Sequence, residues 1–300
     1  AKERITPPPG QKSSVRQDFR DILDNGPWKS MFALTMFMFI TLAMWGGGMY
    51  YYFSYYIDKG AMFSFLQQFG LVNIAGESHG VWHNILNAFG LIAQEDQSNI
   101  FNVGFSFFNM VGQLVTILII IFVATPLSTR FGKRNTFIVG LFLTALVTSL
   151  FMFVKAEQVG TVFLLNILKS LAYAPTIPLL WAMMADVADY SEWKNKRRAT
   201  GFVFAGVVFG LKAGLGFGGA ITGWVVNAFG YVPNAVQDAR AIVGIKLTSS
   251  IIPAFTFFLG VIALFTYKIS KRFNQEIQDE LVERRAALSV EKDKGKSDDE

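Results

Sequence analysis

The stretch from 161 to 231 decides the fold, and it reads TVFLLNILKSLAYAPTIPLLWAMMADVADYSEWKNKRRATGFVFAGVVFGLKAGLGFGGAITGWVVNAFGY. Two apolar segments are joined by the charged turn ADVADYSEWKNKRRATG at 185–201. Each segment exceeds about 20 residues, enough for a helix to cross a hydrocarbon layer about 30 Å thick. Each also carries one lysine near its middle, Lys169 in the first and Lys212 in the second. Because an ammonium group at bilayer depth is costly, the two lysines indicate a path for a substrate or an ion.

The composition of the 300-residue chain is that of a membrane protein, with 52% hydrophobic and 16% charged residues. The hydrophobic residues fall in long blocks, unlike those of an ordinary soluble domain. The net charge is +5, but the basic residues lie between the apolar blocks, a pattern typical of membrane orientation. We therefore expect a lipid bilayer as partner and no nucleic acid. The absence of cysteine excludes disulfides and cysteine metal sites.

Six apolar blocks predict an all-α integral membrane bundle with six transmembrane helices. The blocks lie at 31–57, 101–125, 136–154, 161–185, 200–229 and 247–269. The chain accordingly divides into a polar segment at 1–30, a transmembrane domain at 31–270 and a charged tail at 271–300. The long loop at 58–100 contains two stretches with helical spacing of apolar residues, which predict short helices. The tail predicts a short helix at 271–289 and disorder at 290–300.

The distribution of lysine and arginine predicts the orientation of the bundle. Of the 27 basic residues, 21 lie in the first segment, the turns after the second and fourth blocks, and the tail. Four lie on the other side, and the remaining two are the lysines inside the blocks. Since basic loops stay in the cytoplasm, both termini are expected to be cytoplasmic.

A glycine ridge runs along the fifth block, where Gly206, Gly210, Gly214 and Gly218 recur at every fourth position. Such a ridge lets a neighbouring helix backbone approach closely. Lys212 lies about 200° around the helix from Gly210, so it points away from the ridge. It also lies about 18 Å from the cytoplasmic end of the helix, which is too deep for easy snorkelling. We therefore interpret Lys212 as a functional lysine rather than an interfacial one.

A second polar face lies on the fourth block. Its members follow the spacing i, i+3, i+7, i+10, and they are Asn166, Lys169, Tyr173 and Thr176. Pro175 and Pro178 then interrupt the helix, which is tolerated where a cavity is lined. This face predicts a binding wall, and a helix–helix hydrogen-bond seam is the alternative. Trp181 could stack on a sugar or simply pack.

Acidic residues are missing from the central depth of all six blocks, and Asp186 and Asp189 come only at the end of the fourth. Two lysines without carboxylate partners would be expensive, so an anionic substrate or acids from another polypeptide segment should meet them. His79 and His83 stand four apart, but no acidic or cysteine cluster accompanies them, so we expect no metal site. With no nucleophile–base arrangement either, an enzyme is not expected.

Three sequence features together resemble the glycoside–pentoside–hexuronide:cation symporter family of the major facilitator superfamily. They are ADVADYSEWKNKRRATG, the glycine-rich helix with its lysine, and FGYVPNAVQDARAIVGI at 229–245. In addition, AKERITP at 1–7 resembles that family's central cytoplasmic loop, and PLSTRFGKRN at 126–135 resembles the short basic turn of the superfamily. The resemblance covers essentially the whole chain, as the C-terminal six of twelve helices.

The resemblance implies half of a major facilitator fold, built as two inverted three-helix repeats, in the bacterial inner membrane. It implies sugar transport coupled to Na⁺ or H⁺ by alternating access, without other cofactors, together with an N-terminal six-helix half. Lys212 matches the family lysine close to the cation and sugar sites. Three further residues match charged residues of a cytoplasmic gate between the halves, and Arg130 is a candidate partner for them. These three are Asp186, Asp189 and Arg198.

Two departures from the family pattern bear on these expectations. Thr129 stands where the basic turn usually has aspartate, which weakens the gate contact, and Val207 and Val208 replace polar residues before the lysine. The valines put a melibiose-like sugar in doubt. The expected substrate cavity is lined by Lys212, Lys169, Asn166, Tyr173 and Trp181. The alternatives are an anionic or amphiphilic cargo such as a uronide or lysolipid, and a non-transporting membrane scaffold.

Overall fold

The computed structural model describes residues 14–73 and 80–297, with side chains as far as 287. Within these residues the secondary structure is helical, apart from one isolated β-bridge between Val72 and Ala93. Six stretches are long and apolar enough to span a membrane. The predicted all-α bundle with six spans is therefore confirmed.

Three of the spans are continuous helices or nearly so, and three are interrupted. The continuous ones are α2 (Gly26–Tyr55), α7 (Lys133–Leu150) with the 3₁₀ turn Phe151–Phe153, and α10 (Thr200–Ala228). The interrupted ones are α5 (Ile100–Ile119), the π-turn η1 (Ile120–Ala124) and α6 (Thr125–Phe131); α8 (Val159–Tyr173) and α9 (Thr176–Asn195); and α11 (Ala239–Ser249) and α12 (Ile251–Phe265). The short helices outside the spans are α1 (Val15–Leu23), α3 (Lys59–Gln68) and α4 (Val81–Ala88), and the long tail helix is α13 (Lys271–Ser297).

The observed helices differ from the prediction in two places. The sixth span begins at Ala239 instead of 247, because α11 precedes α12 and the chain turns at Ser250, where φ is −133° and ψ is −86°. The tail helix runs to Ser297, so the disorder predicted from 290 onwards is wrong for most of that stretch. The break in the fourth span lies at Pro175, as expected.

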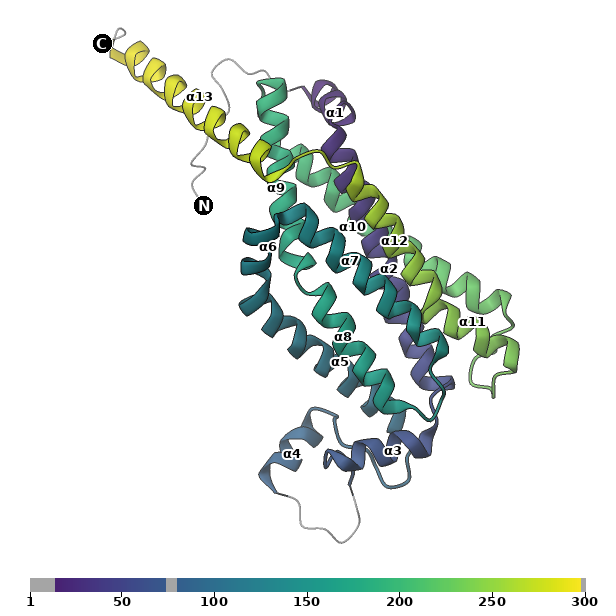
Figure 1. The fold of residues 1–300 in the computed structure, drawn as a ribbon. Coiled ribbons are helices and arrows are strands. Elements are labelled where there is room, and N and C mark those ends of the chain that lie inside the picture. The colour runs from purple at the N-terminus through teal and green to yellow at the C-terminus, as the bar shows by residue number, and fades with distance from the viewer. Residues whose placement is uncertain (1–13, 74–79, 298–300) are drawn as a thin grey trace.

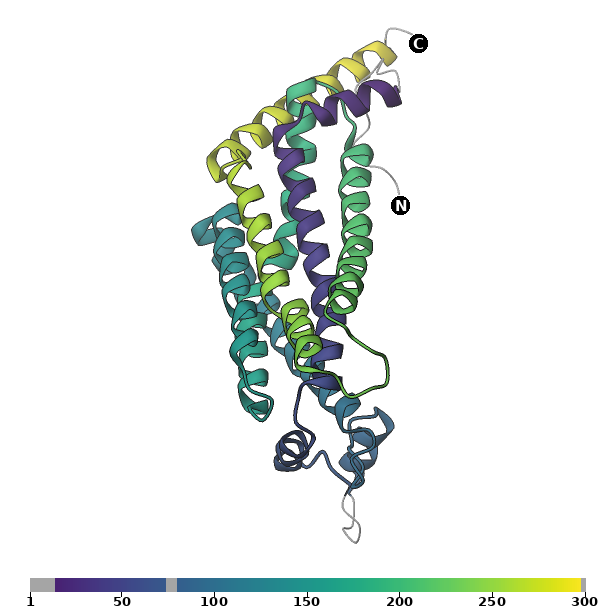
Figure 2. The ribbon, with the colours of Figure 1, turned by 90° about the vertical axis from the view of Figure 1, so that its right-hand side faces the viewer.

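The helix α2 lies at the centre of the bundle and packs against α10, α12 and α11, with smaller contacts to α5 and α9 (Figures 1 and 2). The glycine ridge of α10 faces it. A Cβ on Gly214 would lie 2.6 Å from the Met36 carbonyl oxygen, and one on Gly218 would meet the Ile40 carbonyl. The predicted close approach is therefore confirmed, with α2 as the partner.

Two peripheral helices, α7 and α12, pack against each other and present apolar side chains outwards. The exposed residues are Val139, Phe142, Leu143, Leu146 and Leu150 on α7, and Phe255, Phe258, Ile262 and Phe265 on α12. Aliphatic and aromatic side chains at this depth are what lipid tails accommodate. This side of the bundle therefore faces the bilayer.

The two ends of the bundle differ in charge. At one end, called the basic end here, lie α1, α13 and the basic turns that join α6 to α7 and α9 to α10 (Figures 1 and 2). Arg197 of the latter turn forms ion pairs with Asp18 and Asp21 of α1, each at 3.1 Å. The opposite end carries α3 and α4. This arrangement agrees with the basic residues lying on one side of the membrane.

Candidate functional site

A stripe of polar residues follows one exposed face of α5. Its members are Asn102, Ser106, Asn109 and Gln113. Their spacing of four, three and four residues places them on one side of a helix. Polar side chains at this depth cannot face lipid tails without cost, so this side of α5 faces water or protein. Our sequence reasoning missed this stripe, although its spacing was readable.

A second exposed stripe runs along α10, opposite the glycine ridge. Its members are Lys212, Gly216, Gly219 and Gly223, again at spacings of four, three and four. A Cβ added to any of these three glycines would meet nothing within 4 Å. Lys212 therefore points away from the ridge, as predicted. Among the described residues, no carboxylate lies within ion-pair distance of its ammonium.

Between these two stripes lies α2, which exposes Gly46 and Tyr50. The Tyr50 ring packs edge-on against Phe105 of α5, with centroids 5.8 Å apart. Trp181 of α9 is 46% exposed and borders a small pocket with Val208 of α10. We call the exposed stripes of α5 and α10, together with Gly46, Tyr50 and Trp181, the inner face. In contrast to the outer sides of α7 and α12, it is polar and rich in glycine.

Lys169 is half-buried between α8 and α2, and its partner is aromatic. Its Nζ lies 3.8 Å from the centroid of the Trp45 ring. A desolvated cation–π contact contributes about 2 kcal/mol, whereas desolvating an ammonium group costs several kcal/mol. Trp45 therefore compensates Lys169 only in part. The sequence did not reveal this pair, because its members lie 124 positions apart on different helices.

Asn166 occupies a packing seam instead of a cavity wall. It is 2% exposed, and its Nδ2 donates to the Phe108 carbonyl of α5 at 2.7 Å. Gly112 of α5 makes room for it, since a Cβ there would lie 2.8 Å from the same nitrogen. The helix–helix seam, which the sequence left open as the alternative, is what the structure shows at Asn166.

The other members of the predicted polar face also point in different directions. Thr176 is fully buried, and its hydroxyl donates to the Tyr173 carbonyl at 2.6 Å across the proline break. The Tyr173 ring packs against Phe257 of α12, with centroids 5.9 Å apart. The four residues therefore do not form one continuous wall. Of the predicted cavity residues, Lys212 and Trp181 lie on the inner face, and the binding role of all five stays a prediction.

At the basic end, Asp186 pairs with Lys133 at the start of α7, at 2.7 Å. It also accepts a hydrogen bond from Asn274 of α13 at 3.2 Å. Arg130, the candidate partner from the sequence, instead lies over the neighbouring Phe131 ring at 5.4 Å. The structure thus places Lys133 against Asp186, because α7 packs beside α9 and presents its first residue there.

Asp189 is engaged by the tail helix α13. It accepts hydrogen bonds from Gln278 at 2.8 Å and from Arg285 at 3.4 Å. Arg285 also binds both carboxylate oxygens of Glu192, at 3.1 and 2.9 Å, and this hydrogen bonding raises the pKa of its guanidinium. Arg198 lies half-buried in the following turn.

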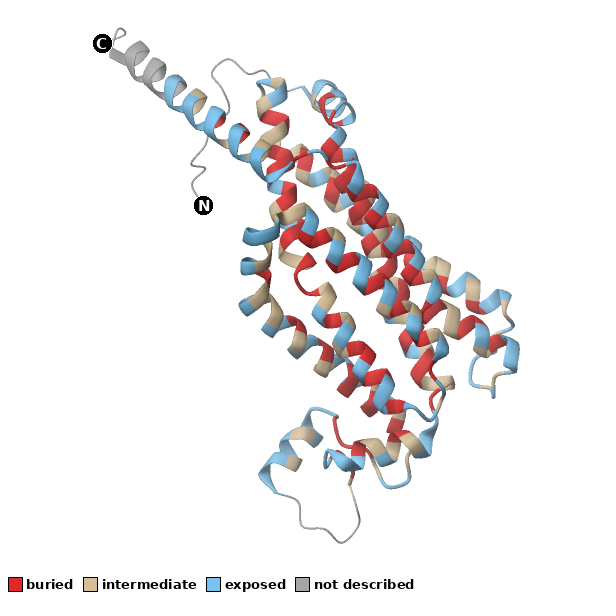
Figure 3. Ribbon diagram, viewed as in Figure 1, coloured by how far each residue is buried: buried red, intermediate tan, exposed pale blue. Residues whose placement is uncertain are grey.

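Apolar packing accompanies these polar contacts of α13. Ile277 and Leu281 are buried, while most of the other tail residues up to 287, where the described side chains end, are exposed (Figure 3). The Phe273 ring meets Trp193 of α9 edge-on, with centroids 5.5 Å apart. The tail is therefore docked on α9 along the face that carries the predicted gate carboxylates. The sequence predicted a helix here but gave no indication of where it binds.

Replacing Arg285 with alanine should loosen the tail helix without unfolding the bundle. The variant loses three charge-assisted hydrogen bonds to Glu192 and Asp189, so docking should weaken by about 2 kcal/mol. Hydrogen exchange of α13 amides, followed by mass spectrometry, measures this effect. Arg272→Ala is the matched control, because the Arg272 side chain is 92% exposed and its one ion pair with a described residue is to Glu276, one turn away on the same helix. Unchanged exchange in Arg285→Ala would contradict the docking role.

Metal binding finds no support among the described residues, which contain no group of three or more histidine, cysteine, aspartate or glutamate side chains able to hold an ion. His79 lies outside the described residues. The coupling ion, Na⁺ or H⁺, stays a prediction.

Comparison with known proteins matches residues 95–271, more than half of the chain, to the family described as MFS/sugar transport protein. The chain belongs to this family. Together with the relatives below, this membership confirms the resemblance to glycoside–pentoside–hexuronide:cation symporters and the major facilitator type of bundle.

Three relatives illustrate the match. The inner membrane symporter YicJ of Escherichia coli is 27% identical over 285 residues, which cover 94% of this chain and 52% of the relative. The isoprimeverose transporter of Lactiplantibacillus pentosus is 40% identical over 162 residues, covering 53% of this chain and 33% of the relative. The glucuronide carrier protein homolog of Escherichia coli is 27% identical over 156 residues, covering 52% and 34%. Where the match covers nearly all of this chain, the chain spans about half the length of the relative.

Proposed function

We propose that this chain is the C-terminal half of a secondary transporter that moves a sugar together with Na⁺ or H⁺ by alternating access. The inner face is the observation that carries the proposal. Its polar side chains and its lysine lie at bilayer depth on a side of the bundle where lipid would be a poor neighbour. The family and the relatives named for sugars and glycosides give the substrate class.

An N-terminal six-helix half is the proposed partner of the inner face. Gly216, Gly219 and Gly223 leave space for a helix backbone to approach α10, as Gly206 to Gly218 do for α2. The polar stripe of α5 and Lys212 would then border a water-filled space between the halves. Substrate sites of such transporters lie near the midplane, where two repeats meet.

Lys212 is the residue we assign to coupling. It lies 12 positions after Thr200, so it is about 18 Å from the basic end of a helix that spans the hydrocarbon layer. Neither it nor Lys169 has a carboxylate partner among the described residues, so a hydroxyl-rich or anionic substrate, or acids of the partner half, would stabilise both. Trp181 offers an exposed ring on which a sugar face could stack.

The basic end would form the cytoplasmic gate, with both termini in the cytoplasm of a bacterial inner membrane. Asp186, Asp189 and Arg198 would contribute to it, as the resemblance implies. Because α13 binds Asp189 from the side, the tail would have to share or release this carboxylate whenever the gate closes. The gate would therefore include the tail helix as well as the two halves.

Uptake by right-side-out membrane vesicles tests the transport proposal. Vesicles containing the full-length protein should accumulate a labelled glycoside when an inward Na⁺ or H⁺ gradient is applied. This accumulation should stop when the gradient is dissipated. Competition by neutral and by acidic sugars then defines the cargo. Inhibition by uronides or lysolipids, but not by neutral sugars, would mean that the cargo is anionic or amphiphilic. If neither glycosides, uronides nor lysolipids are taken up, the transport proposal is wrong.

A further inference from the structure

A cavity of about 420 Å³ opens at the basic end, outside the inner face. It lies between the turn that joins α6 to α7, Asp186 in the middle of α9, and the connection from α12 to α13. Its charged lining residues are Lys133, Arg134, Lys271 and Asp186, so three cations face one carboxylate. Of these four charged residues, only Asp186 has a part in the proposed transport mechanism, at the gate.

The charge of the cavity is positive because only one of its cations is neutralised. Lys133 pairs with Asp186 at 2.7 Å. Arg134 instead donates to two carbonyl oxygens at the end of α12, at 3.1 and 3.0 Å, and Lys271 donates to the Thr129 carbonyl at 3.0 Å. Since carbonyl groups carry no net charge, Arg134 and Lys271 keep theirs, and the cavity attracts anions.

The first turn of α7 adds hydrogen-bond donors to the same lining. This 18-residue helix begins at Lys133, and no side chain caps its N-terminus at Gly132. The backbone amides of Lys133, Arg134 and Asn135 are therefore left without intrahelical acceptors, and the helix dipole places partial positive charge there. Helix N-termini of this kind hold phosphate groups in many proteins.

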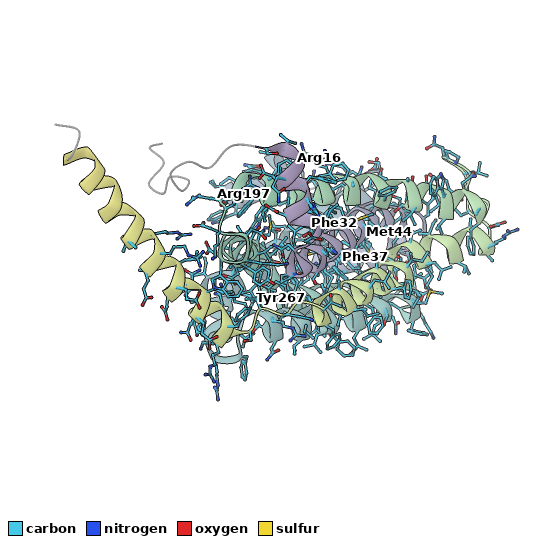
Figure 4. The ribbon with its side chains drawn as sticks, turned by 90° about the horizontal axis from the view of Figure 1, so that it is seen from above. Arg16, Phe32, Phe37, Met44, Arg197 and Tyr267 are labelled. Atoms are coloured by element: carbon cyan, nitrogen blue, oxygen red, sulfur yellow. The ribbon has the colours of Figure 1, made fainter. Side chains whose placement is uncertain are left out.

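An unpartnered hydroxyl provides independent evidence for a ligand. Tyr267 lines the cavity and is 1% exposed, yet its hydroxyl has no hydrogen-bond partner among the described residues. A buried polar group without a partner costs about 1–3 kcal/mol. Burial, helped by the nearby Asp186 charge, raises the pKa of this phenol above its ordinary value, so it keeps its proton as a donor. Figure 4 shows Tyr267 at the end of the bundle from which α13 projects.

We propose that this cavity binds a phosphate group, either of an anionic phospholipid head group or of free phosphate. Phosphate oxygens accept hydrogen bonds from the Tyr267 hydroxyl and the α7 amides, and the guanidinium and ammonium groups of Arg134 and Lys271 balance their charge. The cavity lies beside Phe131 and Phe265, which are 54% and 61% exposed at the edge of the apolar surface. A head group in the adjacent leaflet can therefore reach it.

Native mass spectrometry of the detergent-solubilised protein tests the proposal with phosphatidylglycerol as the probe. The test variants are Tyr267→Phe and Lys271→Gln. Tyr267→Phe removes only an unpartnered hydroxyl, so the fold should be retained, and Lys271→Gln removes one charge. Each should weaken binding about tenfold, as expected for the loss of one hydrogen bond to a charged group. Lys268→Gln is the matched control, because Lys268 is exposed three positions away and does not line the cavity.

A parallel titration with inorganic phosphate, read as a shift in unfolding temperature, separates the two sources. Binding of the lipid alone assigns a head group, and binding of both probes assigns the phosphate group itself. Failure of both probes, or equal binding by wild type and the two test variants, would overturn the proposal. The readout does not involve uptake, so it stands or falls separately from the transport proposal.

Discussion

Cation-driven uptake by the full-length transporter should fall about a hundredfold, close to background, when Lys212 is replaced by alanine. This is the loss expected when about 3 kcal/mol of charge-assisted contact disappears from the coupling step. Lys212 is exposed on the inner face and has no ion pair among the described residues, so its removal leaves no buried partner behind. Expression and unfolding temperature should therefore stay unchanged, which separates a functional loss from misfolding.

The control for this experiment is Lys155→Ala. Lys155 is an exposed lysine in the turn before α8, at the opposite end of the bundle from the basic turns. The Lys155→Ala substitution removes one positive charge, as Lys212→Ala does, but at a position outside the membrane. Uptake by this variant should equal that of the wild type. Normal gradient-driven uptake by Lys212→Ala would exclude this lysine from the coupling mechanism. An equal loss in both variants would point to the overall charge instead.

The features that were predictable from the sequence are those set within one helix. The spans followed from the length of the apolar blocks, and the glycine ridge and the direction of Lys212 followed from helical periodicity alone. The break at Pro175 followed from local chemistry, since proline lacks the amide that a continuous helix needs. Each of these predictions depended only on residues within a single span.

The features that were not predictable depend on which helices are neighbours. Asn166 could equally have lined a cavity or joined two helices, and only the position of α5 makes it a seam residue. Lys169 reaches Trp45 because α2 lies beside α8. In the same way, the choice of Lys133 over Arg130 as partner of Asp186, and the docking of the tail on α9, arise from packing between distant segments.

Two glycines of α10 that lie two positions apart should respond in opposite ways to the same substitution. Gly214→Ala should destabilise the bundle by about 1–3 kcal/mol, because its Cβ would lie 2.6 Å from the Met36 carbonyl and 3.0 Å from the Phe39 Cβ. Gly216→Ala should leave this chain's own fold as stable or more stable by up to about 1 kcal/mol, since the new methyl meets nothing within 4 Å and alanine favours helix. Unfolding of the purified chain in detergent measures both.

Uptake by the full-length protein should be sensitive to the side chain at position 216, although the stability of this chain alone is not. If the N-terminal half packs on the inner face, a bulky side chain there blocks its approach, so Gly216→Leu should abolish uptake while the chain itself stays folded. Leu215→Ala is the neighbouring control, because Leu215 is exposed and lies outside the glycine and lysine stripe. Full uptake by Gly216→Leu would mean that no helix approaches this face closely, and the proposed partner would then have to bind elsewhere. Loss of uptake in Gly216→Leu alone would support the exposed stripe of α10 as the surface on which the N-terminal half packs.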